Sequence, residues 1–379
     1  MKALVAGAGI GGLAAGIALR EAGYEVEIFE RARELREIGA GLMIWPNGTR
    51  SLRALGVEPT ALTVQRITFC NWHGRRLIET PVDLISKRYG SAAAVVHRAD
   101  LQAALSARFG NDGLRLGAEV AGFEQDEAQV RIELRDGSVV AGDLLVGADG
   151  LHSVVRRGTL DDGDPVYLGS TVWRGMVSSK GLDLAPGHGI NWVGRASEFL
   201  AFHLADDRIY WAGVTEEPRG EKPGPGSHKL DLLERFGKWH ALVPALIVAT
   251  DDRKILRNDM YDRPPAKRWS RGRVTLVGDA AHPMTPNQGQ GACQALEDAV
   301  ALGDSLARES DVAKAFDLYE RRRLRRANGS VVMSRRAARA VQIGNPLLCA
   351  IRDGLASLLP RRVMLRIVDA TLAAPKVER

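Results

Sequence analysis

The first thirty residues carry the feature that most limits what this chain can fold into. Residues 2–7, KALVAG, form an apolar run ending in glycine, which predicts a short buried parallel strand. Gly7, Gly9 and Gly12 then give the spacing G-x-G-x-x-G at the start of an alanine-rich helix, and the next strand, YEVEIFE, ends at Glu30. Strand, glycine turn, helix, strand and terminal acid together predict a βαβ unit that binds a dinucleotide.

Each residue of this unit has a physical role in such binding. Gly7 permits the tight turn, Gly9 lets the backbone approach a pyrophosphate, and Gly12 lets helix and strand pack closely. The pyrophosphate is expected at the positive N-terminus of the helix, and Glu30 is placed to accept hydrogen bonds from the adenosine ribose. The turn alone does not distinguish FAD from NAD(P).

Two later segments also have a strand followed by a turn and a helix. In residues 143–157, DLLVGADGLHSVVRR, the strand stops at Asp149, and Ser153 is suited to cap the next helix. Residues 273–279, RVTLVGD, form a buried strand ending at Asp279, and apolar spacing predicts a helix over residues 292–307.

The loop 280–291 between that strand and helix is suited to a flat ligand. Pro283 and Pro286 stiffen it, whereas Gly289 and Gly291 let the backbone come close to a planar group. The helix after the loop directs its positive end towards the ligand, which favours the negative charge of a reduced flavin. Asp279 is placed to bind hydroxyl groups such as those of a ribityl chain.

In this order, GAGIGG, GADGLHSVVR and GDAAHPMTPNQGQG resemble the motifs of the single-component (class A) FAD-dependent aromatic hydroxylases with the p-hydroxybenzoate hydroxylase fold. The resemblance covers most of residues 1–330. HRADL, residues 97–101, is similar to a family segment in which an arginine reaches the cofactor, and residues 39–47 resemble the mobile loop near the flavin ring. The implied fold is α/β: a Rossmann-like FAD-binding domain, an antiparallel β-sheet substrate domain and C-terminal helices.

By the same resemblance, one set of residues is expected to bind FAD, and Asp149 is expected to serve the pyridine nucleotide as well. The set is Gly7, Gly9, Gly11, Gly12, Glu30, Arg31, Gly41, Leu42, Met43, Arg98, Gln102, Asp149, Asp279, Pro286, Gly289, Gly291 and Ala292. The chain has no second G-x-G-x-x-G motif, so NAD(P)H is expected to bind transiently as a co-substrate.

The strand patterns divide the chain into three parts. The FAD-binding domain is expected to be discontinuous, over residues 1–65, 91–165 and 262–330. Residues 66–90 and 166–261 are rich in strands and turns and should form a sheet that covers the flavin. Residues 331–379 are expected to be helical, and the Pro/Gly-rich segment 216–229 is expected to be a loop.

The substrate contacts are less determined by the pattern. In EFLAFHLA, alternation puts Phe199, Ala201 and His203 on one face of the strand and Leu200 and Phe202 on the other. His203 and Tyr210 are the catalytic candidates, because a histidine can accept a phenolic proton. The pocket candidates are Trp173, Arg174, Trp192 and Arg195. The alternative for the histidine and the aromatic residues is a purely structural role in the core.

The resemblance implies an FAD-dependent monooxygenase that uses NAD(P)H and O2 and transfers oxygen to an electron-rich aromatic or heteroaromatic molecule through a flavin C4a-hydroperoxide. A neutral or polycyclic substrate is as consistent with the residues as a benzoate. Three alternatives remain: a related epoxidase or reductase acting on an isoprenoid, a plain NAD(P)-dependent dehydrogenase, and a non-catalytic FAD-binding partner.

Composition excludes some partners and metals. Cys70, Cys293 and Cys349 are widely spaced, and no histidine or cysteine cluster has metal-ligand spacing, so we expect no metal and a reducing, cytoplasmic location. No apolar run is long enough to span a bilayer. No pattern of aromatic and basic residues indicates nucleic-acid binding.

The positive charge is concentrated towards the C-terminus. From Glu320 onwards the chain has 14 Lys or Arg against 4 Asp or Glu, a net charge of +10, including RRRLRR at residues 321–326. A solvated helical face is the simplest interpretation; peripheral contact with a membrane and steering of an anionic cofactor are the alternatives. Further on, Ile351, Leu355, Leu358 and Leu359 form one helical face, which either packs on the FAD domain or forms a dimer or membrane contact. We expect a monomer or a homodimer.

Overall fold

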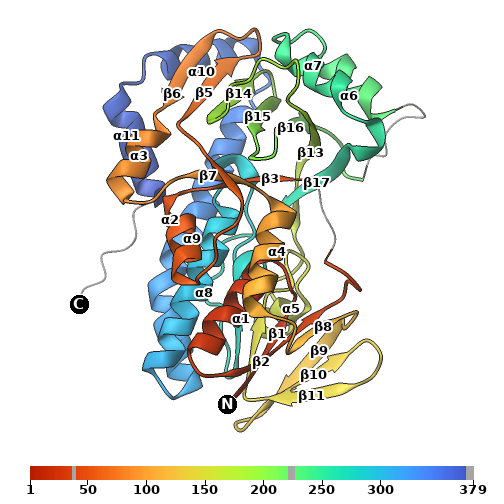
Figure 1. The fold of residues 1–379 in the computed structure, drawn as a ribbon, viewed down its shortest axis with the longest axis vertical. Helices are drawn as coiled ribbons and strands as arrows, with labels where there is room; N and C mark the ends of the chain where they lie inside the picture. Colours follow the sequence, from red (N-terminus) through yellow and green to blue (C-terminus); the bar gives the residue numbers. More distant parts are fainter. Residues whose placement is uncertain (36–39, 221–226, 373–379) are drawn as a thin grey trace.

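The computed structural model describes residues 1–35, 40–220 and 227–372. Figure 1 shows two main sheets, one at each end of the long axis, with helices from the C-terminal third of the chain along one side. Parts of two expected loops, residue 39 and residues 221–226, lie outside the described residues, as do residues 373–379 of the expected helical segment.

A five-stranded parallel sheet forms the part that contains the N-terminus. Its order is β18-β12-β1-β2-β8, and each neighbouring pair is parallel. The strands are β1 (Lys2–Ala6), β2 (Glu25–Glu30), β8 (Leu114–Leu116), β12 (Leu144–Gly147) and β18 (Val274–Leu276). The apolar sequences of β1 and β12 explain their central position, because a strand covered on both faces needs apolar side chains on both.

Helices cover this sheet closely. The helices around it are α1 (Ile10–Glu21), α4 (Arg98–Phe109), α5 (Val154–Leu160) and α8 (Gly291–Arg308). A Cβ at Gly303 of α8 would lie 2.8 Å from the backbone oxygen of Ala18 in α1, so glycine permits the close approach of the two helices. Helix α8 confirms the helix predicted over residues 292–307 to within one residue at each end.

A small antiparallel sheet extends from the parallel one and lies at the lower end of the molecule (Figure 1). It consists of β9 (Val120–Gln125), β10 (Val130–Leu134) and β11 (Val139–Gly142). Buried and exposed residues alternate along β10, as expected for a sheet with one face in solvent.

A seven-stranded sheet forms the opposite end, in the order β17-β13-β16-β15-β14-β5-β6. Its strands are β5 (Arg66–Asn71), β6 (Arg76–Thr80), β13 (Val166–Ser178), β14 (His188–Val193), β15 (Glu198–His203), β16 (Arg208–Glu216) and β17 (Leu256–Asp262). The sheet is antiparallel, as the family resemblance implied, except that β14 and β5 are parallel. The hairpin predicted within residues 66–90 is the β5–β6 pair, with Gly74 in its turn at φ +92°.

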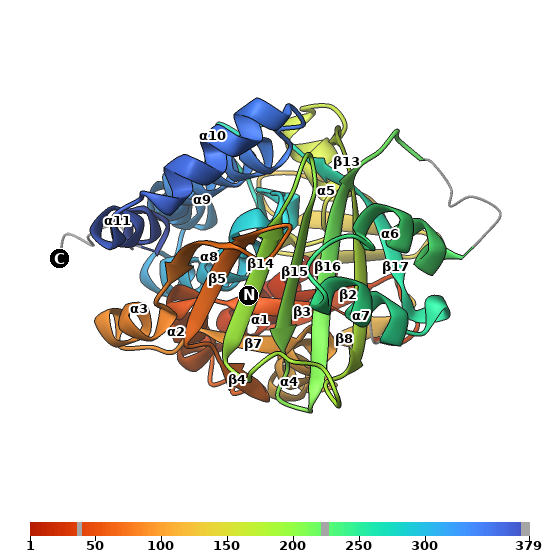
Figure 2. The same cartoon turned by 90° about the horizontal axis from the view of Figure 1, so that it is seen from above.

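One face of the seven-stranded sheet is covered by α6 (His228–Phe236) and α7 (Leu242–Ala249). A buried cluster rich in aromatic residues fills the space between them, including Trp173, Trp192 and Trp211. Figure 2, viewed from above, shows the two helices lying on the outer side of β13 and β16. The other face of the sheet is turned towards the parallel-sheet part.

A three-stranded sheet lies between the two large ones, in the order β3-β7-β4. It consists of β3 (Gly41–Ile44), β4 (Ala61–Thr63) and β7 (Ala94–His97). In the chain, helix α2 (Pro46–Ala54) follows β3, and helix α3 (Val82–Tyr89) precedes β7. Three short 3-10 helices complete the loops: η1 (Asp252–Lys254), η2 (Gly278–Ala280) and η3 (Pro286–Gln288).

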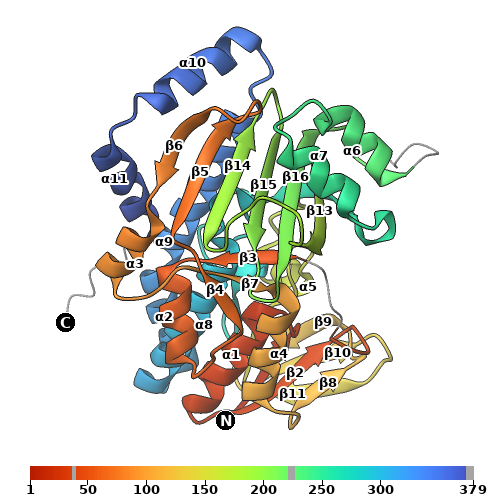
Figure 3. The same cartoon turned by 45° about the horizontal axis from the view of Figure 1, so that its top comes forward.

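The chain ends in α9 (Val312–Val341), α10 (Pro346–Ser357) and α11 (Arg361–Leu372). Figure 3 shows α10 and α11 beside β6 at the edge of the seven-stranded sheet. Helix α9 crosses the boundary expected at residues 330 and 331, and the predicted domain limits remain a prediction. Within the described part of the chain, no helix has the length and apolar character that crossing a bilayer requires.

Candidate functional site

The turn between β1 and α1 leaves part of its backbone open. Gly7 has φ +98°, in the left-handed region, and a Cβ on Gly12 would lie 1.9 Å from the Gly7 oxygen. These two glycines are therefore required by the turn and by the packing of α1 on β1. A Cβ on Gly9 would meet nothing within 4 Å, and no side chain caps the N-terminus of α1. The free N–H groups at Gly9 suit a pyrophosphate.

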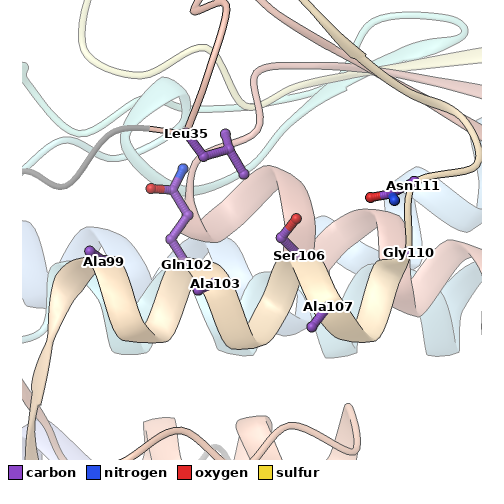
Figure 4. Close-up of a pocket in the computed structure, with 8 residues that line it drawn as sticks. All are labelled: Leu35, Ala99, Gln102, Ala103, Ser106, Ala107, Gly110 and Asn111. Atoms are coloured by element: carbon purple, nitrogen blue, oxygen red, sulfur yellow. The ribbon is translucent and has the colours of Figure 1, made fainter.

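Two predicted residues hold Ala8 in this turn. Glu30 accepts hydrogen bonds from the backbone N–H of Ala8 at 2.8 Å and of Ala32 at 2.9 Å, and Gln102 donates to the Ala8 oxygen at 2.8 Å. Gln102 also lines a hollow of about 470 Å³ along α4 (Figure 4). Arg31, at the end of β2, is exposed. The structure thus brings Glu30 and Gln102 to the same end of the expected dinucleotide.

The principal cleft has a volume of about 530 Å³ and lies between the parallel sheet and the seven-stranded sheet. Both glycine-bearing turns line it, although they are almost three hundred residues apart in the sequence. Twelve residues singled out in the sequence line this cleft: Gly9, Gly11, Gly41, Leu42, Met43, Arg98, Tyr210, Asp279, Pro286, Gly289, Gly291 and Ala292.

Asp279 and Arg98 are the only charged side chains among the described residues that line the cleft. Asp279 is open to the cleft, yet the surrounding protein raises the pKa of its carboxyl, with Arg98 and His282 opposing the rise. Burial lowers the pKa of Arg98, and Asp279 opposes that change. Neither side chain makes a hydrogen bond to another described residue, so both remain available to a polar ligand.

Loop 285–290 contributes several buried polar atoms that lack a partner among the described residues. They are Thr285 Oγ1, Asn287 Oδ1, Gln288 Oε1 and Gln290 Nε2. The loop is fixed from the other side, because Trp45 Nε1 donates to the Gln288 oxygen at 3.0 Å. A buried polar atom without a partner costs free energy, so this set indicates a site built for a ligand with its own donors and acceptors.

Helix α8 begins at this loop without a capping side chain. Gly289 has φ +61°, and a Cβ there would lie 3.3 Å from the Met43 Cβ and from Trp45 Nε1. The glycine therefore keeps the loop in its left-handed turn close to β3. The open N-terminus of α8 faces the cleft through Gly291 and provides the positive end expected from the sequence.

A buried ion-pair network supports the loop from behind. Asp298 accepts hydrogen bonds from His282 at 2.5 Å and from Arg323 at 2.8 Å. Burial opposes ionisation of Asp298, but His282 and Arg323 outweigh it and lower its pKa to about 2. Arg323 and Arg326 both pair with Glu297. Arg323 is buried and positions the loop, which corrects the solvated-face interpretation for that residue, whereas Arg321 and Arg325 of the same run are exposed.

Asp149 has a structural role at the start of α5. Its carboxylate accepts hydrogen bonds from the Ser153 hydroxyl and from the backbone N–H of Val154 at 2.8 Å, so it caps α5. Burial raises its pKa against these hydrogen bonds. Ala148 and Gly150, its neighbours, line the cleft instead. The expectation that Asp149 serves FAD and the pyridine nucleotide remains a prediction.

The seven-stranded sheet covers the cleft with apolar side chains. Leu200 and Phe202 of β15 line it, and so does Tyr210, which pairs with Phe202 across the strands. Tyr210 is buried, which raises its pKa, and a Cβ on Gly41 would lie 2.7 Å from its ring. Gly41 therefore allows β3 to pass directly beneath this tyrosine.

Four candidates do not line the cleft. Trp173 and Trp192 are buried in the cluster under α6 and α7, and His203 shares the face of Phe199, which belongs to the same cluster. Arg195 is exposed in the turn between β14 and β15. Successive strand residues point to opposite sides of a sheet, so Trp173, Trp192 and His203 face away from the cleft, and Arg195 lies outside it in the turn.

Arg174 occupies an intermediate position. It does not line the cleft, but it lies near enough to lower the pKa of Arg98 and to oppose the rise in the pKa of Tyr210. Its own Nη1 is 3.5 Å from Asn258 Oδ1.

Glu198 is the residue that the sequence reasoning missed. Counted in twos from Leu200 and Phe202, it shares their cleft-facing side of β15. It accepts hydrogen bonds from Asn287 of η3 at 2.7 Å and from Asn191 at 3.3 Å, and both asparagines line the cleft. Burial raises its pKa to about 7, with the Asn191 hydrogen bond opposing the rise. Alternation placed Glu198 in one set with Leu200 and Phe202, but the sequence did not indicate which set faces the cleft.

Comparison with known proteins agrees with this geometry. A family model described as "FAD binding domain" matches residues 1–164 and 203–334. The chain is 38% identical to an aurachin C monooxygenase/isomerase of Stigmatella aurantiaca, over 95% of this chain and 94% of that protein. It is 34% identical to an FAD-dependent urate hydroxylase of Klebsiella pneumoniae, over 89% of each.

A solved structure shows the same fold. The crystal structure of Klebsiella pneumoniae HpxO complexed with FAD and uric acid has a TM-score of 0.93 and 31% sequence identity, covering 99% of this chain and 97% of that one.

Proposed function

The chain belongs to the FAD binding domain family, and on this premise we propose that it hydroxylates a neutral, largely apolar aromatic or heteroaromatic molecule. It is an FAD-dependent monooxygenase, as are the relatives it matches over almost its whole length. The class uses NAD(P)H and O2. The observation that supports the choice of substrate is the apolar, nearly uncharged cover of the cleft.

The residues of the cleft fit FAD. We assign the pyrophosphate to the N–H groups around Gly9, the ribose to Glu30, the ribityl hydroxyls to Asp279 and the ring to loop 285–290 with Gly291. The unpartnered polar atoms of that loop and the open N-termini of α1 and α8 support this assignment. When bound, FAD supplies the redox chemistry that activates O2 for transfer of one oxygen atom.

Charge is the argument for a neutral substrate. Arg98 is the only cation among the described residues that line the cleft, and it faces Asp279 on the cofactor side. Arg174 of β13 lies close by, since it lowers the pKa of Arg98 and opposes the rise in the pKa of Tyr210, but it does not line the cleft. An anionic ring would therefore have no cation of its own in the described cleft lining. It would also face Glu198, which ionises near pH 7. An anion leaving water without a partner is strongly disfavoured.

The cover of the cleft has two tasks in this proposal. Leu200, Phe202 and Tyr210 exclude water and hold the aromatic ring against the cofactor side. Glu198 accepts hydrogen bonds from Asn191 and Asn287 and so holds both side chains in place, and these amides offer the substrate a donor and an acceptor. Tyr210 makes no hydrogen bond to a described residue, so its hydroxyl is free to orient a polar group.

Stimulated NAD(P)H oxidation tests the proposal. We expect aurachin C, or a neutral heteroaromatic of similar polarity, to stimulate oxidation and to gain one oxygen by mass spectrometry, with NMR distinguishing ring hydroxylation from an epoxide. Urate and 4-hydroxybenzoate, both anionic, should give little stimulation. Efficient turnover of either anion with no turnover of neutral compounds would refute the choice of substrate. Cytoplasmic location and the oligomeric state, monomer or homodimer, remain predictions.

A further inference from the structure

Helix α10 has its apolar side in solvent. Leu347, Leu355 and Leu358 are 68%, 66% and 78% exposed, and Leu348 and Ile351 are 51% and 49% exposed. Their spacing places them on one helical face. Figure 3 shows α10 on the outside of the molecule, beside β6. A contiguous apolar face of this kind marks a contact surface, whereas single exposed leucines do not.

The opposite side of α10 attaches the helix to the protein. Cys349 is buried, and Arg352 donates to the Gly194 oxygen at 3.1 Å while pairing with Asp353. Asn345 caps the first turn by accepting from the N–H of Leu347 at 2.9 Å. The helix is therefore held in place through its polar side, and its leucines point away from the protein.

Exposed arginines follow this apolar face. Arg361, Arg362 and Arg366 of α11 are exposed, and none of them has an ion-pair partner within the described part of the chain. The acid of the same helix, Asp369, is already paired with Arg88. The exposed surface of α10 and α11 is thus apolar with a positive margin.

Helix α11 also connects this surface to the cleft. Ile367, Val368 and Leu372 line the cleft, and Ile367 is at the same time 45% exposed. A lipophilic molecule held at the α10–α11 surface would meet an apolar wall of the active site without passing through open water.

We propose that α10 and α11 form a docking surface for an anionic lipid bilayer, with the leucines of α10 at the acyl boundary and the arginines of α11 at the headgroups. Charge complementarity selects this occupant. A second copy docked by the same face would offer these arginines no free carboxylate from the described residues of α10 and α11, because Asp353 is paired with Arg352 and Asp369 with Arg88. An apolar helical face with basic residues beside it is the pattern of helices that lie in a membrane interface. The docking does not depend on the proposed substrate.

Vesicle flotation with the FAD-loaded full chain tests the proposal. We expect the protein to float with vesicles of phosphatidylcholine and phosphatidylglycerol in equal parts, and to bind pure phosphatidylcholine much less. Added salt should weaken the binding. Ile351→Gln with Leu355→Gln should reduce partitioning on the order of ten-fold or more. Arg361→Gln with Arg362→Gln should reduce it by roughly five-fold per arginine on anionic vesicles.

A matched control is Val139→Gln with Arg271→Gln, which alters exposed residues near the small β9–β11 sheet at the far end of the molecule. It should leave flotation unchanged, and all variants should keep the flavin absorbance that reports a folded protein. Absence of flotation by the unaltered chain overturns the proposal, as does equal loss in the control. Self-association abolished by Ile351→Gln and Leu355→Gln, without vesicle binding, assigns the face to a second copy and also overturns it.

Discussion

Replacing Glu198 by glutamine should change how stability depends on pH. The carboxyl is buried between β15 and η3, and burial raises its pKa from the usual 4.5 to about 7. Glutamine has the same shape. Its amide can also donate to Asn191 Oδ1 or Asn287 Oδ1, both of which lack a partner among the described residues, if the side-chain amide orientations adjust.

The magnitude follows from the two pKa values. Their difference, about 2.5, multiplied by about 1.4 kcal/mol for each pKa unit gives about 3 kcal/mol as an order of magnitude. The folded state binds this proton more tightly than the unfolded state. The contribution to stability is therefore complete below the unfolded pKa of 4.5 and is lost as pH rises through about 7. Glutamine does not titrate, so its contribution to stability does not change over this pH range.

Urea unfolding followed by tryptophan fluorescence provides the assay, at about pH 5 and about pH 8. The free energy of unfolding of Glu198→Gln, relative to the unaltered chain, should rise by roughly 2–3 kcal/mol between the two pH values. Glu133→Gln, at an exposed position on β10, is the control and should show no such trend.

A constant difference between Glu198→Gln and the unaltered chain over this pH range would refute the reasoning. It would mean that Glu198 stays ionised in the folded protein. A cation or water would then stabilise its carboxylate in addition to the hydrogen bonds from Asn191 and Asn287.

Three further predictions follow from the site. Gly12→Ala should lower the free energy of unfolding by several kcal/mol in urea titrations, since its Cβ would lie 1.9 Å from the Gly7 oxygen. Gly9→Ala should unfold like the unaltered chain but retain less FAD, as measured by absorbance, because a Cβ there would meet nothing within 4 Å. Equal stability of the two variants would contradict this prediction. Asp279→Ala should purify largely without FAD, and a fully yellow protein would count against the ribityl assignment. Arg323→Met should cost about 3–5 kcal/mol in urea unfolding, because it leaves Asp298 buried without that partner, and a loss below 1 kcal/mol would show the network to be dispensable.

Local patterns carried much of the prediction. The five-residue strand before Gly7, the helix after it and the acid at Glu30 are all short-range features, and the structure has each of them in place. The same holds for α8, whose apolar spacing gave its extent to within one residue at each end. These elements depend on neighbouring residues, so one sequence is enough to find them.

The sequence did not show which face of each strand in the seven-stranded sheet lines the cleft. Alternation along β15 divided its residues correctly into two sets, but nothing local indicated which set faced the cleft. The answer depends on α6 and α7, whose apolar sides cover Phe199 and leave Leu200 and Phe202 to the cofactor side. His203 and Trp192 were therefore chosen from the wrong face, and Glu198 was overlooked on the right one.

The sequence by itself determined the dinucleotide-binding turn and the strands and helices around it, since glycine spacing and periodicity act over a few residues. The choice of FAD came from the resemblance of its motifs to a known family. The resemblance implied that the turns at Gly9 and Gly289 hold one FAD, and the structure places both turns in one cleft. Only the tertiary structure decided that Arg323 is buried and that α11 forms a wall of the active site. Those facts depend on contacts between segments up to hundreds of residues apart. Such contacts are set by the packing of whole elements and leave no periodic trace in the chain.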